Sequence, residues 1–253
     1  MKKSLHFFLV LVAAFICQNS AFAQANTYLN LGLNIPNGKY GSNANNCILF
    51  NNGDYGGANL GFNVGFKFVN HTKAEGLGFM FTVDGMFNML KNNIKAEDFV
   101  PYYVPEIEGI AINVKNPKYL NLPIMAGLNY SFRFNRNFGA FVEAGAGVNA
   151  RFITPCKITA YDYTLELKPD YTFKSSYTAK FCFTYQVGLG FTIKDAIYLG
   201  INYFNLGSAT VEGSTEKLLK TTASAPVVGE TETFKYGQLA TRMFVIRLGI
   251  HLQ

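Results

Sequence analysis

Histidines and paired carboxylates, the side chains that most often perform acid–base chemistry or bind metals, are sparse in this chain. Beyond residue 23 the only histidines are His71 and His251. A Ser-His-acid triad or a histidine metal site needs partner groups that the sequence places beside neither of them. Asp162 and Glu166 lie four residues apart in a polar connecting segment, where carboxylates are normally solvated. We therefore predict no catalytic residue, no metal site and no cofactor, and we expect that the protein is not an enzyme.

Two Gly-x-Gly pairs resemble parts of nucleotide-binding loops. They are Gly145-x-Gly147 and Gly188-x-Gly190. Both fall inside predicted strands and neither is followed by a helix, so the structural context that a phosphate-binding loop requires is missing. Glycine inside a strand more often marks close packing or a bend.

The cysteines have no metal-ligand spacing. Cys47 and Cys156 fall in predicted long loops, where an oxidising compartment permits a disulfide between them. Two free thiols are an equally good interpretation, and the sequence leaves this choice open. Cys182 falls on the polar face of a predicted strand, where we expect a small buried residue.

Three charged residues form the best candidate cluster: Asp84, Glu143 and Arg247. Each falls on the polar side of an alternating pattern, the side that would face the interior of a barrel. Buried charges must be paired, because an isolated buried ion is very unfavourable. Counting residues from the strand ends predicts a Glu143–Arg247 ion pair with Asp84 nearby. A structural plug is the favoured interpretation, and a polar conduit is the alternative.

Strict alternation of apolar and polar residues defines the elements that would position these charges. From Asn59 to Phe68, every even position is large and apolar and every odd position is small or polar. Successive side chains of a strand point to opposite faces, so such a segment has one apolar face and one polar face. Eight segments show this pattern: residues 27–35, 57–69, 76–90, 118–132, 138–152, 177–193, 197–206 and 241–252.

The connections between these segments alternate in length. Residues 70–75, 133–137 and 194–195 form short links, and residues 36–56, 91–117, 153–176 and 207–240 form long ones. Short turns on one side and long loops on the other are typical of outer-membrane barrels, whose strand number is even and at least eight. The sequence therefore predicts an all-β fold: an eight-stranded antiparallel up-and-down transmembrane β-barrel. It would lie in the outer membrane of a Gram-negative cell, in contact with its lipid, with both termini periplasmic.

The first 23 residues have the pattern of a cleaved signal peptide. Lys2 and Lys3 precede a short apolar run, and Ala21-Phe22-Ala23 matches a cleavage site. We expect residues 24–253 to form the barrel domain. Charged residues make up 15% of the chain, against about 25% in a typical soluble domain. The net charge of +6 is scattered without a Lys/Arg run, so we predict no nucleic-acid partner.

The third long link contains a second alternating pattern. Tyr161 and Tyr163 alternate with polar residues before Pro169-Asp170, and Tyr171 and Phe173 resume the alternation afterwards. This predicts a β-hairpin that projects from the membrane and continues the neighbouring strands. Its aromatic side chains, and a strand edge able to pair, are the surface we expect to bind a partner.

Two segments carry a family resemblance. Tyr119-Leu120-Asn121-Leu122-Pro123-Ile124 opens a strand after a long loop, and Phe141-Val142-Glu143-Ala144-Gly145 occupies the middle of the next. Together with the signal peptide and the eight strands, they resemble PorT-like outer-membrane β-barrel proteins of the OmpA/OmpX-like group. The chain departs from many such barrels at its end, Ile250-His251-Leu252-Gln253, which lacks a terminal aromatic residue. The resemblance implies the fold and an association with protein secretion.

Three functions are compatible with this pattern. The leading hypothesis is a non-enzymatic membrane scaffold whose long loops bind an extracellular or envelope protein. The second is transport, either as a narrow pore or as an accessory of a secretion machine. The third, a soluble lipocalin-like binder, is disfavoured because an exposed barrel surface would need more charged residues.

Overall fold

The computed structural model describes residues 25–42, 57–71, 76–93, 110–162, 170–220 and 228–252. The predicted signal peptide and Cys47 lie outside these residues. Within them the chain forms eleven strands and one 3₁₀ turn, Gly38–Tyr40. The strands are β1 (Ala25–Asn37), β2 (Ala58–His71), β3 (Gly76–Leu90), β4 (Ile110–Lys115), β5 (Lys118–Arg133), β6 (Phe138–Ile153), β7 (Cys156–Asp162), β8 (Asp170–Tyr177), β9 (Lys180–Ile193), β10 (Ile197–Lys220) and β11 (Val228–Leu252).

Eight of these strands close into an antiparallel up-and-down barrel. The ladder runs β1-β2-β3-β5-β6-β9-β10-β11, and β11 returns to pair with β1. The closing ladder runs from Thr27 opposite Leu252 to Asn37 opposite Arg242. The predicted fold class is therefore confirmed. Ring closure leaves the barrel part of the sheet without an edge.

The alternation in the sequence sorts side chains between two environments. On β2, the Phe62 side chain points outward and is 57% exposed, whereas Asn63 points into the lumen and is 2% exposed. The same alternation of exposed and buried residues runs along β3, β5, β6 and β9. Apolar residues outside and polar residues inside are the reverse of a soluble barrel.

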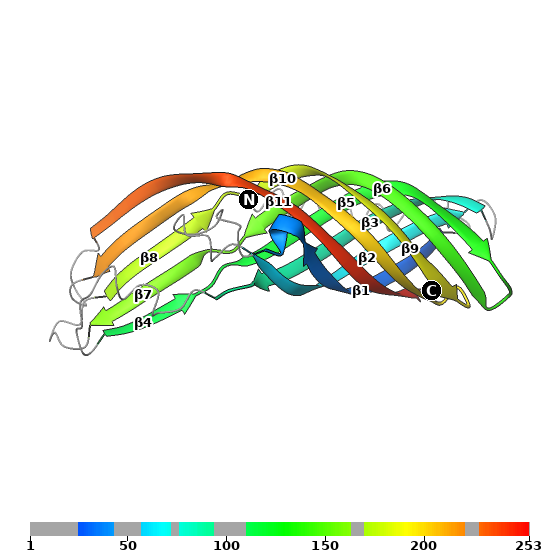
Figure 1. Ribbon diagram of the computed structural model, residues 1–253, viewed down its shortest axis with the longest axis horizontal. Helices are drawn as coiled ribbons and strands as arrows, with labels where there is room; N and C mark the ends of the chain where they lie inside the picture. Colours follow the sequence, from blue (N-terminus) through cyan, green and yellow to red (C-terminus); the bar gives the residue numbers. More distant parts are fainter. Residues whose placement is uncertain are drawn as a thin grey trace.

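The other strands build a sheet that projects from one end of the barrel (Figure 1). Beyond Leu206, β10 and β11 continue together as a long ribbon. β8 pairs with this part of β10, β7 pairs with β8, and β4 pairs with β7. We call this five-stranded unit the projecting sheet: β4, β7, β8 and the distal parts of β10 (208–220) and β11 (228–240). The short turns and the C-terminal end of β11 lie at the other end of the barrel, which we call the short-turn end.

The projecting sheet corrects two expectations. Residues 91–117 and 207–240 were expected as loops, but they contain β4 and the distal halves of β10 and β11. The ladder between β10 and β11 is irregular between Asn205 and Ser208, where Gly207 adopts a φ of +83°. A glycine with positive φ interrupts the alternation of side chains between the two faces, so the sequence pattern predicts that the strand ends there. Beyond it small and charged residues prevail as far as Lys217, so the alternation of large apolar and polar residues that revealed the other strands is absent.

No helix in the described part of the chain has the length and apolar character needed to cross a bilayer.

Candidate functional site: the lumen and the projecting sheet

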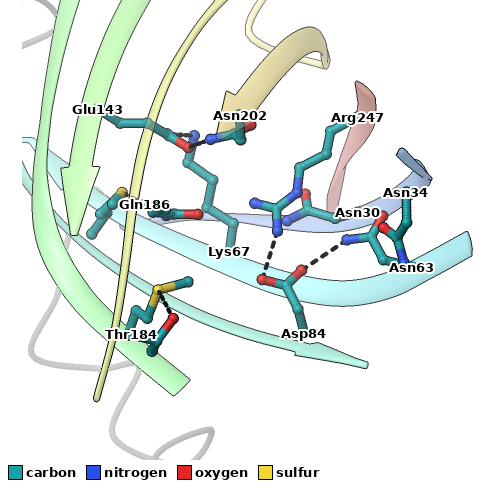
Figure 2. Close-up of polar contacts among 12 residues, drawn as sticks. Asn30, Asn34, Asn63, Lys67, Asp84, Glu143, Thr184, Gln186, Asn202 and Arg247 are labelled. Carbon is teal, nitrogen blue, oxygen red and sulfur yellow. Dashed lines mark hydrogen bonds and ion pairs between the residues drawn. The ribbon is translucent and has the colours of Figure 1, made fainter. Parts of the chain in front are cut away.

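A layer of polar side chains crosses the middle of the lumen (Figure 2). Lys67 on β2 and Glu143 on β6 form an ion pair. Arg247 on β11 and Asp84 on β3 form a second, with 2.7 Å between Nη2 and Oδ2. All four side chains are at most 2% exposed, so solvent does not screen them. Two positive and two negative charges make the layer electrically balanced.

Amide side chains donate to both oxygens of Glu143 and to one oxygen of Asp84. Asn202 Nδ2 donates to Glu143 Oε1 at 2.6 Å, and Asn129 Nδ2 donates to Glu143 Oε2 at 3.3 Å. Asn63 Nδ2 donates to Asp84 Oδ1 at 3.2 Å. Hydrogen bonds of this kind are needed to offset the desolvation of buried carboxylates.

The predicted ion pair between Glu143 and Arg247 is wrong, although both residues and Asp84 belong to one cluster. The ladder from Glu143 passes through Gly188 and Asn202 and reaches β11 at Val245. From Arg247, the ladder passes through Gly32 to Asn63, the residue that binds the Asp84 carboxylate. The strands of a barrel are tilted and staggered, so counting residues from strand ends does not give equal heights. The prediction also overlooked Lys67 as the partner of Glu143.

Apolar layers close the lumen on both sides of these charges. Towards the short-turn end, Lys67 Nζ lies 4.1 Å from the centre of the Phe141 ring and 4.6 Å from that of Tyr198. Tyr28, Val69, Met80, Phe141 and Tyr198 form a buried cluster there. Towards the projecting sheet, a second layer is almost fully buried: Tyr40, Met86, Tyr119, Met125, Phe204, Leu206 and Met243. Side chains therefore fill the interior along its length, as expected for eight strands.

The inner face of the projecting sheet continues this second apolar layer. Cys156 and Ile158 on β7 and Val211 on β10 belong to the same buried cluster as the lumen residues. Half-buried neighbours extend it over all five strands: Ile112, Val114, Phe173, Tyr177, Phe234 and Tyr236. Cys156 is 2% exposed and packs within the apolar cluster, and this burial raises the pKa of its thiol to about 11.

The outer face of the projecting sheet is polar and carries ion pairs. Lys180 Nζ donates to Glu212 Oε2 at 2.5 Å, and Lys235 Nζ lies 3.4 Å from Glu212 Oε1. The hydrogen bond from Lys180, with the charges of both lysines, lowers the pKa of the Glu212 carboxyl below its ordinary value. The outer face is thus polar, whereas the inner face is apolar near the barrel and carries the Lys217–Glu232 ion pair farther out.

A family model described as an outer membrane protein beta-barrel domain matches residues 7–225. The chain belongs to this family. Among solved structures, this outer-membrane barrel is similar to Ail, the attachment invasion locus protein of Yersinia pestis. The two are 13% identical, with a TM-score of 0.33, and the match covers 90% of this chain and 97% of Ail. OprG from Pseudomonas aeruginosa is 9% identical, with a TM-score of 0.37 and coverage of 90% and 94%. No curated protein sequence matches the chain.

The outward side chains of this outer-membrane barrel have the composition expected of a lipid-facing surface. Large apolar residues are exposed on every strand of the ring, among them Leu33, Phe66, Phe79, Leu128, Val148, Phe183, Leu199 and Phe244. Exposure of so much apolar surface would be unfavourable in water and is favourable in hydrocarbon.

The predicted hairpin forms, but its surroundings differ from the expectation. β7 and β8 pair from Cys156 opposite Ser175 to Tyr161 opposite Asp170. Both strand edges are already used, by β4 and by β10, and Phe173 packs against the apolar cluster. Tyr171 lies on β8, while Tyr163, Pro169 and Glu166 lie outside the described residues. The hairpin is therefore the middle of a sheet and not an isolated ribbon.

Sequence reasoning placed Cys182 correctly and missed several site residues. Cys182 is buried in the lumen, where Arg151 Nη2 donates to its sulfur at 3.5 Å. The missed residues lie on β4 and on the distal parts of β10 and β11. There the apolar positions are too few, and the runs too short, for alternation to reveal a strand. Within the described residues, no group of three or more His, Cys, Asp or Glu side chains could hold a metal ion.

Proposed function

We propose that this protein is a non-enzymatic outer-membrane anchor that presents a sheet for binding an extracellular or envelope protein. The supporting observation is the division of the chain into a side-chain-filled barrel and a five-stranded extension of its wall. In this proposal the barrel provides attachment, and the projecting sheet provides the binding surface. Both chain termini lie on the periplasmic side, and the projecting sheet lies outside the cell.

The apolar inner face is the proposed contact surface. Phe173, Tyr177, Phe234 and Tyr236 gather on one side of the sheet and are only half-buried among the described residues. The Tyr177 and Phe234 rings lie 5.6 Å apart, and the Phe234 and Tyr236 rings lie 4.7 Å apart. Tyrosine and phenylalanine supply large contact area with little loss of side-chain entropy, and aromatic residues are enriched in protein interfaces.

Within the family, we propose that the chain is PorT-like. The support is the strand β5, which begins Lys118-Tyr119 and places Pro123 opposite Asn149 of β6, with Tyr119 buried at the mouth of the lumen. The alternative function, a narrow transport pore, is less well supported because apolar layers close the lumen on both sides of the charges. An accessory role in secretion needs no open pore and is one form that the proposed protein contact could take.

Site-specific photo-cross-linking in cells tests the proposal. A photoreactive residue would replace Phe234 on the inner face or, as the matched control, Phe183 on the lipid-facing wall of β9. We expect one discrete protein adduct from position 234 and none from position 183. Heat-modifiable migration on a gel would verify that both variants form the barrel. Adducts of equal intensity at both positions, or no adduct at position 234, would refute the proposed contact surface.

A further inference from the structure

Three lysines stand side by side on the outer face of the projecting sheet. Lys115 of β4 lies directly opposite Lys157 of β7, and Lys157 lies directly opposite Lys174 of β8. Their neighbours in the chain, Val114 and Ile158, pack against the apolar inner cluster. Successive side chains of a strand point to opposite faces, so these lysines point outward. We call Lys115, Lys157 and Lys174 the lysine row.

The lysine row is only partly neutralised by its surroundings. Like charges directly opposite each other on neighbouring strands are destabilising. Glu216 Oε2 lies 3.2 Å from Lys174 Nζ, and the nearby Glu212 already binds Lys180 and Lys235. Lys115 and Lys157 are exposed and form no ion pair with the described residues. The row therefore has an excess of positive charge that the described part of the chain leaves unbalanced.

The height of the row relates it to the lipid headgroups. Phe152 of β6 is exposed on the lipid-facing wall, and Lys157 follows it by five residues. A rise of about 3.3 Å per residue and a tilt of about 35–45° place Lys157 about 12–14 Å above Phe152. The headgroup layer is about 5–8 Å thick on each side of a bilayer. Lysine stems can bend along apolar surface towards such a layer while the ammonium stays hydrated.

We infer that the lysine row binds anionic, phosphate-bearing headgroups of the lipid leaflet that surrounds this end of the barrel. Neighbouring strands are about 4.8 Å apart, so the ammonium groups of Lys115 and Lys157 can face one phosphate together, beside the Lys174–Glu216 pair. A phosphate between them would replace mutual repulsion by attraction, and lysine is an effective point-charge partner for phosphate. This contact uses the face opposite to the proposed protein-binding surface and does not depend on that proposal.

Native mass spectrometry of the full barrel in neutral detergent tests this inference. The probes are phosphatidylglycerol, which is anionic, and phosphatidylcholine, which is zwitterionic. Wild-type protein should prefer phosphatidylglycerol. The Lys115→Gln/Lys157→Gln variant should lose roughly 30-fold in affinity for it, because each lysine near an anionic lipid surface contributes roughly a fivefold step in affinity. The Lys115→Arg/Lys157→Arg variant should retain the affinity, as should Lys217→Gln, which alters a lysine paired with Glu232.

Unfolding midpoints provide a second readout, in which the glutamine substitutions and the added lipid are expected to act differently. Without anionic lipid, the double glutamine variant should be slightly more stable than the wild type, because repulsion within the row is relieved. Added phosphatidylglycerol should raise the midpoint of the wild type and not that of the variant. Equal phosphatidylglycerol affinity in the two proteins would overturn the inference. So would equal binding of the two lipids by the wild type, or displacement of bound phosphatidylglycerol by millimolar inorganic phosphate.

Discussion

The pairing of the four lumen charges can be tested by removing them in matched and mismatched combinations. Asp84→Asn leaves the Arg247 guanidinium without an ion-pair partner in a site where both side chains are fully buried. Loss of one partner of such a pair destabilises a protein by about 3–5 kcal/mol, since the remaining charge is desolvated and uncompensated. Arg247→Met should therefore cost a similar amount. The matched double variant Asp84→Asn/Arg247→Met removes both charges and should be more stable than either single variant.

The mismatched combination separates the observed pairing from the alternative. Lys67→Met/Asp84→Asn strips the partner from both Glu143 and Arg247, so the two losses should add and the barrel should refold poorly. If Glu143 and Arg247 were themselves the pair, this double variant would keep that pair intact and would lose little stability. Urea titration in detergent micelles, with the folded fraction measured by heat-modifiable gel mobility, gives the stabilities of the wild type, the two single variants and the two double variants. A mismatched variant as stable as the single variants would refute the structural pairing.

Three other perturbations have defined outcomes. Phe62→Arg puts a charge on the lipid-facing wall and should lower the urea stability by about 2–4 kcal/mol if it lies near the bilayer midplane. Gly249→Ala should unfold at clearly lower urea than Gly85→Ala, because a Cβ at 249 overlaps a tyrosine ring while one at 85 meets its nearest atom at 3.5 Å. The ion pairs of Glu212 should stabilise the protein fully above pH 4.5, the ordinary pKa of the carboxyl, and this stability should be lost as pH falls through the lowered pKa of the folded state. Lys180→Gln should therefore make the urea midpoint fall less steeply with acid. An unchanged slope would contradict the assignment.

The barrel could be predicted from the sequence because its strands separate lipid from a polar lumen, and these two environments impose an alternation of apolar and polar residues. Along β3 the predicted and observed bounds coincide, since lipid on one side and a polar lumen on the other force strict alternation. In the distal part of β10 polar residues lie on both faces, Thr215 and Lys217 on one and Glu216 on the other, so the sequence shows no apolar face there. β4 has six residues, and its partner β7 is more than forty residues away, so no local pattern announces the pairing.

The sequence predicted which charged residues lie in the lumen, but not which of them form ion pairs with each other. Asp84, Glu143 and Arg247 could be assigned to the lumen because each falls on the polar side of its own strand. Which carboxylate meets which cation depends on the stagger between strands that are far apart in the chain. That stagger places Asn202 beside Glu143 and Asn63 beside Asp84, and it leaves Lys67 as the cation within reach of Glu143.

The continuity of β10 and β11 through both parts of the molecule has a consequence for the order of folding. This ribbon pairs residues that are neighbours in the chain, down to Leu219 opposite Val228, so its formation requires little loss of chain entropy. The seam between β1 and β11 joins Thr27 to Leu252, almost the whole length of the described chain. Contacts so distant in sequence form slowly. The ribbon can therefore serve as the early template on which β9 and β8 assemble at different heights, with closure of the β1–β11 seam as the last and slowest step.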